Sequence, residues 1–511
     1  MFAKVHSSAV FGIDAYPVEV EVDYSRGNEL NIRLVGLPDA AVKESTDRVI
    51  SAIKNSQRFF QHGRIVINLA PADIKKEGPS FDLPIALGWL VASGEVPPIE
   101  FENYAIVGEL ALDGAVRPIQ GVLPIAVCAR EQGKYGIIVP EENAPEASVV
   151  DKLNVIPVRN LNEAIEFLVG KFKISPVRKN IKEIFQQSSV YANDFSEVKG
   201  QYHAKRAIEV AVAGAHNILM IGPPGAGKTM LAKCIPTIIP EMTLDEAIET
   251  TKIHSINGLL SKTHFLIGTR PFRSPHHTIS YAGLIGGGAI PKPGEVSLAN
   301  HGVLFLDELP EFKRDVLEVL RQPLEEKTVT ISRAVASLTF PANFMLAAAM
   351  NPCPCGFFTD RRRECRCTPP MIRKYMMKIS GPLLDRIDIH IEVPAVEYKD
   401  LSSKHDAVAS DNIRNRINEA RHIQSERFKG SKLHTNSAMT PRHIKKYCEL
   451  DNECDEMLKH SIVELGISAR AYHRIIKVAR TIADLENSER IKPNHISEAI
   501  QFRTLDRNLW V

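Results

Sequence analysis

The chain has 511 residues, enough for several domains that each bury a core of their own. Its 63 lysine and arginine residues nearly balance 61 aspartate and glutamate residues, so the net charge of +2 favours neither a nucleic acid nor a membrane, and any basic surface must be local. The chain begins without the basic and apolar segments of an export signal, and no apolar run approaches the ~20 residues that cross a bilayer, which indicates a cytoplasmic protein with no membrane partner.

The first region, residues 1–170, mixes strand-like and helix-like patterns. Val18–Val22 and Arg64–Leu69 have the composition of β-strands, and amphipathic stretches typical of helices lie between such runs. A polar, basic connector follows over 171–193. The sequence therefore predicts an α+β domain and a linker.

A glycine-rich loop opens the next region and is the most specific signal in the chain. It follows the apolar run 217–221 and leads into a helical pattern, which is the strand–loop–helix context of a P-loop. Backbone N–H groups of such a loop surround phosphates, Lys228 neutralises the β- and γ-phosphates, and the Thr229 hydroxyl holds Mg²⁺. We therefore expect an ATP and Mg²⁺ site formed by Gly222, Pro223, Pro224, Gly225, Ala226, Gly227, Lys228 and Thr229.

A second element of this site is the apolar run 303–306, which ends in Asp307 and Glu308. A buried parallel strand reads as a continuous apolar run and carries ligand groups at its carboxyl end. Asp307 is expected to coordinate Mg²⁺ through water, and Glu308 to polarise the water that attacks the nucleotide.

Three further polar residues follow at positions suited to the same reaction. Asn351 ends the apolar run 344–350 and is expected to orient the water or sense the γ-phosphate; a plain turn residue is the alternative. Arg386 has no evident partner in its own site, so it suits an arginine finger inserted into a neighbouring subunit, with an ion pair to Asp385 or Asp388 as the alternative. Arg470, in the helical region, is placed to reach back over the γ-phosphate.

Two insertions are candidates for substrate contact. A long stretch rich in glycine and proline precedes the Asp-Glu strand, and 327–340 alternates and breaks in its middle as a β-hairpin does. The pair His276–His277 has no third ligand nearby, which argues against a metal. The cations in and beside these insertions are Lys262, Arg270, Arg273, Lys292 and Arg333.

Four of the eight cysteines fall within residues 353–367 as two Cys-x-Cys pairs. Four thiolates match tetrahedral zinc in number, and their proline, glycine and arginine neighbours are unlike those of buried inert thiols. The one-residue spacing is tighter than usual, so a redox pair and free thiols remain alternatives. The pattern favours a structural zinc site made of Cys353, Cys355, Cys365 and Cys367.

The remaining stretch, 396–511, is almost entirely helix-periodic and predicts a helical lid over the nucleotide. The helices are expected at 411–428, 441–450, 452–465, 469–486 and 493–504.

Together these motifs resemble the AAA+ ATPases, and most closely the magnesium-chelatase-like YifB/ComM family. The resemblance implies an AAA+ P-loop α/β core over 194–395 with hairpin insertions, the zinc insertion at 353–367, and Val198, Gly200 and Gln201 beside the adenine. It also implies a hexameric, ATP-driven motor whose hairpins project into the ring pore. There the cations of the two insertions would contact the phosphates of a nucleic-acid strand, unless the hairpin is purely structural. The matching stretches are 195–201, 211–220, 272–278, 351–356, 381–386 and 479–485.

The first region resembles a different fold, the Lon-protease-like domain, which belongs with domain 2 of ribosomal protein S5. The stretches 77–86 and 108–118 carry this resemblance. In that family the serine at the position of Ser80 is a nucleophile activated by a lysine, but that lysine position falls at about Leu123 here. A serine without an amine to accept its proton is a poor nucleophile, which disfavours a peptidase. Contacts within a ring, or a surface facing DNA, are the expected roles of this domain.

The family resemblance implies DNA helicase activity and branch migration in homologous recombination during natural transformation, with single-stranded or branched DNA as partner. The alternative is a chelatase-type ATPase that remodels a protein partner. The Lon-like domain and the cysteines depart from chelatase motor subunits and favour DNA.

Overall fold

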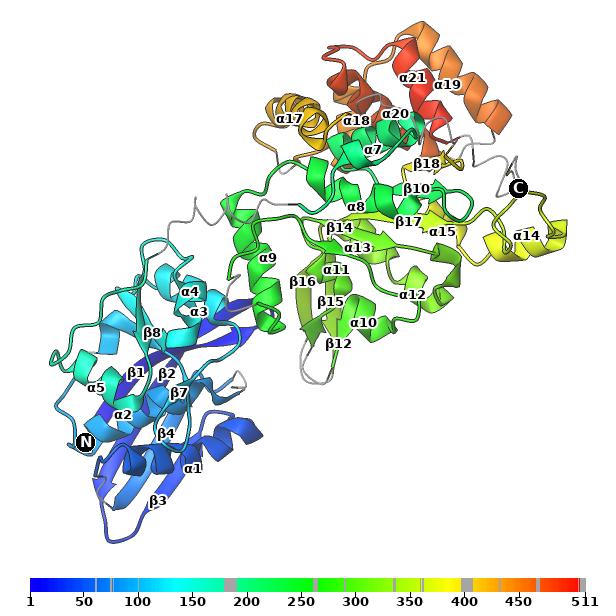
Figure 1. Cartoon of the computed structure of the whole chain (residues 1–511). Coiled ribbons are helices and arrows are strands. Elements are labelled where there is room, and N and C mark those ends of the chain that lie inside the picture. The colour runs from blue at the N-terminus through cyan, green and yellow to red at the C-terminus, as the bar shows by residue number, and fades with distance from the viewer. Residues whose placement is uncertain are drawn as a thin grey trace. The chain divides into compact units, whose positions relative to one another are not determined.

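The computed structural model describes residues 1–59, 62–73, 76, 78–99, 101–178, 191–260, 265–288, 291–333, 337–358, 360, 363–396, 408–431, 433–465, 469–503 and 505 (Figure 1). The chain forms two compact units. Unit 1 contains residues 1–188 and 244–268, and unit 2 contains 189–243 and 269–511. Within the described residues, no helix combines the length and apolar character needed to cross a bilayer.

Unit 1 is an α+β structure built on a four-stranded sheet. Strand β1 (Phe2–Phe11), β2 (Asp14–Arg26) and β4 (Gly63–Ala70) pair antiparallel in that order, and β3 (Asn31–Val35) pairs parallel with β4. Buried and more exposed residues alternate along β4, which gives the sheet one apolar face. The helices α1, α2, α3, α4 and α5 cover Ala40–Asn55, Asp82–Ala92, Val122–Glu131, Ala144–Ala147 and Leu161–Leu168.

Five shorter strands complete unit 1 in two small sheets. The first is parallel, in the order β5 (Tyr104–Ile106), β8 (Gly136–Pro140) and β9 (Asn154–Val158). The second pairs β6 (Glu109–Leu110) with β7 (Val116–Arg117).

Helix α9 (Leu244–Ile256) belongs to unit 1 although it follows the P-loop in sequence. It packs on α3, and its Ser255 hydroxyl donates a 2.5 Å hydrogen bond to the buried carboxylate of Glu146 on α4. Burial raises the pKa of Glu146, so this hydrogen bond satisfies a group that is costly to bury. The sequence predicted one continuous ATPase core over 194–395. The structure instead places residues 244–268 of that range in unit 1.

Unit 2 contains a five-stranded parallel sheet in the order β11, β14, β17, β10 and β18. Its strands read as the apolar runs expected of a sheet covered on both faces, and all the residues of β10, β14 and β17 are buried. Their bounds are Phe272–Arg273 (β11), Val303–Leu306 (β14), Met345–Met350 (β17), Ile218–Ile221 (β10) and Ile389–Glu392 (β18).

The predicted hairpin is present as β15 (Thr328–Ser332) paired antiparallel with β16 (Ser337–Pro341). A smaller pair joins β12 (Gly286–Gly287) to β13 (Lys292–Pro293). The core helices are α7 (Tyr202–Gly214), α8 (Lys228–Ile238), α10 (Tyr281–Ile285), α11 (Glu295–Leu298), α12 (Arg314–Glu318), α13 (Arg321–Glu326), α14 (Pro369–Met376) and α15 (Gly381–Leu384).

The helical region shares one hydrophobic core with the parallel sheet, from Phe195 to Phe502. Its helices are α17 (Ser410–Arg427), α18 (Pro441–Tyr447), α19 (Asn452–Leu465), α20 (Ala469–Leu485) and α21 (Pro493–Gln501). The predicted fold class is therefore confirmed: a parallel α/β core, a helical C-terminal region and a separate α+β unit.

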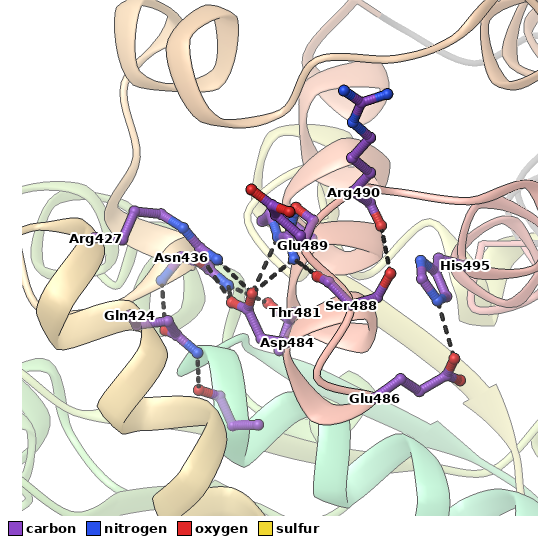
Figure 2. A network of polar contacts seen from close by, with 12 residues as sticks. Gln424, Arg427, Asn436, Thr481, Asp484, Glu486, Ser488, Glu489, Arg490 and His495 are labelled. Carbon is purple, nitrogen blue, oxygen red and sulfur yellow. Dashed lines mark hydrogen bonds and ion pairs between the residues drawn. The ribbon is translucent and has the colours of Figure 1, made fainter.

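A buried polar network ties the helices to one another (Figure 2). The Asp484 carboxylate accepts hydrogen bonds from Arg427 at 2.7 and 2.5 Å and from the Asn436 amide at 2.8 Å. Asn436 also donates to the Thr481 hydroxyl, which in turn bonds His216 of the core at 2.9 Å. Because removing one partner leaves a buried group unsatisfied, this network fixes how the helices sit on the sheet.

Candidate active site

The P-loop, Asp307 and Asn351 meet at one edge of the parallel sheet. They follow β10, β14 and β17, which are neighbours in the order β14-β17-β10, and the carboxyl ends of parallel strands share an edge. A cavity of about 410 Å³ lies there. It is lined by Pro224, Gly225, Ala226, Gly227, Lys228, Thr229, Met230, Asp307, Glu308, Met350 and Asn351.

The backbone conformation of the P-loop explains why glycine occupies three of its positions. A side chain at Gly222 would place its Cβ 2.1 Å from the Val393 carbonyl oxygen, so only glycine fits beside β18. Gly225 and Gly227 have φ values of +77° and +88°, which glycine adopts without strain, and nothing lies within 4 Å of a Cβ built on either. The loop is thus open on the side where phosphates would approach its N–H groups.

The Lys228 ammonium lies at the centre of this loop. It donates hydrogen bonds to the carbonyl oxygens of Gly222 at 2.7 Å and Pro223 at 2.9 Å, and to the Asn351 Oδ1 at 3.2 Å. Burial lowers the pKa of Lys228, and the nearby carboxylates of Asp307 and Glu308 oppose that shift. A buried cation held only by neutral oxygens is suited to an anionic ligand, which fits a nucleotide phosphate.

The two residues expected to hold Mg²⁺ are already in contact. The Thr229 hydroxyl donates a 2.8 Å hydrogen bond to the Asp307 Oδ2, so an alcohol and a carboxylate oxygen lie side by side, as the hard oxygen ligands of Mg²⁺ require. The neighbouring Glu308 has a φ of +52°, and its N–H donates to the Asp307 Oδ1 at 2.9 Å. This uncommon backbone conformation turns the chain sharply after β14.

His277 contacts the same glutamate, which the sequence did not predict. Its Nδ1 lies 3.4 Å from the Glu308 Oε2, and its ring lies 4.1 Å, centroid to centroid, from that of His276. Both histidines follow β11, the parallel neighbour of β14, so their loop emerges beside Asp307 and Glu308. The one available signal was their position just after a short strand, which is weak without knowledge of strand order.

Comparison with known proteins identifies the family. The model described as magnesium chelatase, subunit ChlI, matches residues 194–401; that of subunit ChlI of Mg-chelatase matches 20–143, and that of the ChlI C-terminal part matches 407–503. The chain is 44% identical over 509 residues to the "Competence protein ComM" of Haemophilus influenzae, covering 99% of this chain and 98% of that protein. The chain belongs to the magnesium-chelatase-like YifB/ComM family of AAA+ ATPases.

Other relatives agree with this family and with the resemblance of unit 1. The "Uncharacterized protein YifB" of Escherichia coli is 41% identical over 506 residues, covering 99% of this chain and 97% of that protein. A "Lon protease" of Aster yellows witches'-broom phytoplasma is 32% identical over 165 residues, covering 30% of this chain and 20% of that protein. The YifB/ComM family implies ATP and Mg²⁺ as ligands, and the cavity lined by Lys228, Thr229 and Asp307 fits them.

Residues expected near the adenine lie close to the P-loop. The Gln201 amide donates to the Ala226 carbonyl oxygen at 3.2 Å and to the Pro394 carbonyl oxygen. Gly200 and Gln201 both have positive φ values, and Val198 is buried. Their contact with adenine stays a prediction.

Arg386 lies outside the cavity and is occupied within its own chain. Its Nη2 forms a 2.5 Å ion pair with the Glu325 Oε1, its Nη1 donates to the Pro382 carbonyl oxygen at 2.7 Å, and its side chain is 9% exposed. The partner is therefore Glu325, and neither Asp385 nor Asp388. A finger role requires this ion pair to open when a second subunit is present.

The Arg470 side chain falls outside the described residues, so its predicted reach to the γ-phosphate stays a prediction. One turn further along α20, Arg474 forms an ion pair with the buried Asp388. Asp388 also bonds His216 at 3.0 Å. Burial would raise the pKa of Asp388, but Arg474 and His216 hold it well below its usual range, so a permanent carboxylate joins the helical region to β18.

The four clustered cysteines converge on one point, although their spacing is tighter than that of usual zinc sites. Sulfur–sulfur distances are 3.3 Å for Cys353–Cys355, 3.7 Å for Cys353–Cys365 and 3.6 Å for Cys355–Cys365. All four sulfur atoms, including that of Cys367, lie within 4.8 Å of one another. A tetrahedral ion with ~2.3 Å bonds to sulfur spaces its ligands about 3.8 Å apart, so the cluster can hold a metal.

The thiols of this cluster differ in acidity. The backbone N–H of Phe357 leads the influences that lower the pKa of Cys355 to about 6. The backbone N–H of Cys367 lowers the pKa of Cys365. Desolvation and the neighbouring thiols have the larger combined effect and raise that pKa to about 12. A cation would remove this conflict by stabilising every thiolate at once.

The cations expected on a nucleic-acid strand are only partly available. Arg270 donates to the carbonyl oxygens of Pro240 and His301, and Arg273 forms a bidentate pair with Glu295 at 2.6 and 2.7 Å. Lys292 and Arg333 are exposed. Lys262 lies outside the described residues. Two of the five expected contacts are therefore engaged inside unit 2.

In unit 1, the Lon-like resemblance does not extend to a catalytic pair. Leu123 is fully buried in α3, and its N–H donates to Glu146 at 2.9 Å. Ser80 lies in a short 3₁₀ turn and its carbonyl oxygen accepts from Gly108. No lysine occupies position 123 to activate Ser80, which argues against a peptidase.

Proposed function

We propose that the protein is a hexameric, ATP-driven motor that moves DNA strands, most directly by branch migration in recombination during DNA uptake. The observation that carries this is the convergence of Lys228, Thr229, Asp307, Glu308 and Asn351 on one cavity. The name of the Haemophilus relative, a competence protein, supports the DNA substrate.

Each residue of the cavity has a separate role in the proposed hydrolysis of ATP. Bound ATP with Mg²⁺ supplies the phosphoanhydride bond and a counter-charge for its oxygens. Lys228 and the loop N–H groups hold the phosphates, and Thr229 and Asp307 hold the metal. Glu308 polarises the attacking water, while Asn351, hydrogen-bonded to Lys228, orients it.

A second candidate is a chelatase-type ATPase that remodels a protein partner. It is favoured by the three family models, all described as parts of a magnesium chelatase subunit. The two candidates separate in one experiment, the steady-state ATPase rate measured with single-stranded, double-stranded and branched DNA and without DNA. The DNA motor requires stimulation by single-stranded or branched DNA. An ATPase indifferent to every DNA form would instead support the remodeller.

The finger role proposed for Arg386 predicts complementation between subunits. Arg386→Ala and Glu308→Gln should each be nearly inactive alone, since a finger contributes about 10³–10⁵ in rate. In a mixed ring, some Arg386→Ala subunits lie next to a Glu308→Gln subunit. The pocket of such an Arg386→Ala subunit has its own Glu308 and receives Arg386 from the neighbour, so both groups are present. Random mixing should restore roughly one pocket in four, because ring contacts are head-to-tail. ATPase assays across mixing ratios measure this, and a mixture no faster than its components would rule out action of Arg386 on a neighbouring subunit's pocket.

The cysteine cluster is proposed to hold one structural Zn²⁺. Elemental analysis of the purified protein should find about one zinc per chain, because four converging thiolates satisfy a closed tetrahedral site. Cys365→Ser should lose most of that metal and unfold at a lower temperature. Cys448→Ser, a buried cysteine outside the cluster, is the control and should keep it. Equal zinc contents in the two variants would rule out this site.

A further inference from the structure

The described cations of unit 2 are unevenly distributed. Residues 363–378 contain five lysine or arginine residues and one glutamate, whereas the whole chain has 63 cations against 61 carboxylates. This short stretch includes the second half of the cysteine cluster and all of α14. This stretch is therefore a local excess of positive charge within unit 2.

A groove of about 780 Å³ lies along this stretch, between α14 and the turn that precedes α12. We call it the basic groove. It is lined by Pro310, Glu311, Phe312, Arg314, Pro370, Arg373, Lys374, Met377 and Lys378. Four of these residues are cations and one is an anion.

The cations of the basic groove are largely available to a ligand. Arg314, Arg373 and Lys374 are exposed, and among the described residues no carboxylate lies within ion-pair distance of Arg373 or Lys374. Lys378 pairs with Glu311 at 3.2 Å, which neutralises the single anion of the groove. This contrasts with Arg270 and Arg273, whose guanidinium groups are already bonded inside unit 2.

The groove also exposes apolar surface. Met377, which directly follows α14, is 74% exposed, and Met371 on α14 is 48% exposed. Exposed apolar side chains within a ring of cations are typical of a binding surface, and a single nucleic-acid strand presents both phosphates and unstacked bases to such a surface.

We infer that the basic groove binds a single-stranded polynucleotide, with Arg373 and Lys374 on its phosphates. This rests on the proposed DNA motor and names where the strand lies. Arginine pairs with phosphate oxygens in a bidentate manner, and each neutralised phosphate releases counterions, so binding should depend steeply on salt.

The test is fluorescence anisotropy of a labelled oligothymidylate with the full-length protein and a non-hydrolysable ATP analogue, over a series of salt concentrations. Log affinity falls as log salt concentration rises. The double variant Arg373→Gln/Lys374→Gln should make this fall less steep by about 1.4, since each single-strand phosphate contact contributes about 0.7 to the steepness. At ~0.1 M salt this corresponds to about 25-fold weaker binding. The ATPase rate without DNA should not change, because neither residue lines the ATP cavity.

The matched control is Lys445→Gln/Lys446→Gln, an exposed basic pair on α18 with the same loss of charge. It should leave the salt slope as in the wild type. Equal slopes for the two double variants would show that the basic groove does not bind the strand, and would leave the proposed DNA motor unaffected. Absence of wild-type binding would instead remove the proposed function itself. If sedimentation shows that Arg373→Gln/Lys374→Gln loses assembly and keeps its DNA affinity, the groove binds a second copy of the chain and the inference is wrong.

Discussion

Lys228→Ala is expected to weaken ATP binding by roughly 30- to 4,000-fold and to abolish hydrolysis at ordinary ATP concentrations. Lys228 is 8% exposed and sits against neutral oxygens, so its ammonium is a desolvated partner for phosphate. Removing one member of such a charge pair costs about 2–5 kcal/mol, and each 1.4 kcal/mol is tenfold in affinity. Titration with a fluorescent ATP analogue measures the loss.

Lys233→Ala is the control for this experiment. It removes the same charge from the same helix, α8, at an exposed position outside the cavity. Its ATP affinity should match the wild type. Unchanged affinity in Lys228→Ala would refute the P-loop assignment.

Glu308→Gln is expected to separate binding from hydrolysis. The amide keeps the size of the side chain but cannot accept a proton from water, and general-base catalysis contributes about 10²–10⁴ in rate. ATP should still bind, because Lys228, Thr229 and Asp307 are untouched. Single-turnover hydrolysis and equilibrium binding, measured on the same preparation, show the two effects apart.

The Glu308→Gln variant should also hold ATP long enough to stabilise an assembled ring, which sedimentation detects. Glu326→Gln, an exposed glutamate outside the cavity, makes the same chemical change and should hydrolyse ATP normally. Normal turnover in Glu308→Gln would remove this residue from the mechanism and leave water activation to another group.

Local patterns predicted the secondary structure well. The helix expected at 452–465 has those bounds, and the hairpin expected over 327–340 is present as β15 and β16. Apolar runs predicted three strands of the parallel sheet, namely β10, β14 and β17. These elements are determined by residues close together in sequence, which is why periodicity and flanking residues reveal them.

Contacts between distant segments could not be predicted in this way. Glu325 pairs with Arg386, and His277 approaches Glu308. Both contacts depend on the order of the strands in the sheet, which local periodicity does not predict. The same holds for the basic groove, where residues near 312 and 374 meet. Arg270 and Arg273 illustrate the converse. Their charge suggested a ligand, but carbonyl and carboxylate groups of unit 2 already accept their hydrogen bonds.

The polar network around Asp484 and the Asp388 cluster also lay beyond the sequence. Both join the helical region to the α/β core through buried carboxylates, and their partners come from segments far apart in sequence. Because partly broken buried networks are unfavourable, we expect the helical region to move as one piece with the groups that anchor it to the core.

The central claim is that ATP hydrolysis at this cavity drives strand movement in DNA. Its most direct measurement is the ATP-dependent conversion of a synthetic four-way DNA junction into duplex products by the full-length protein, with Glu308→Gln alongside. We predict conversion by the wild type with ATP and none by Glu308→Gln, although both bind the junction. Conversion by both proteins at the same rate, or none by a wild type that hydrolyses ATP on the same junction, would contradict the claim.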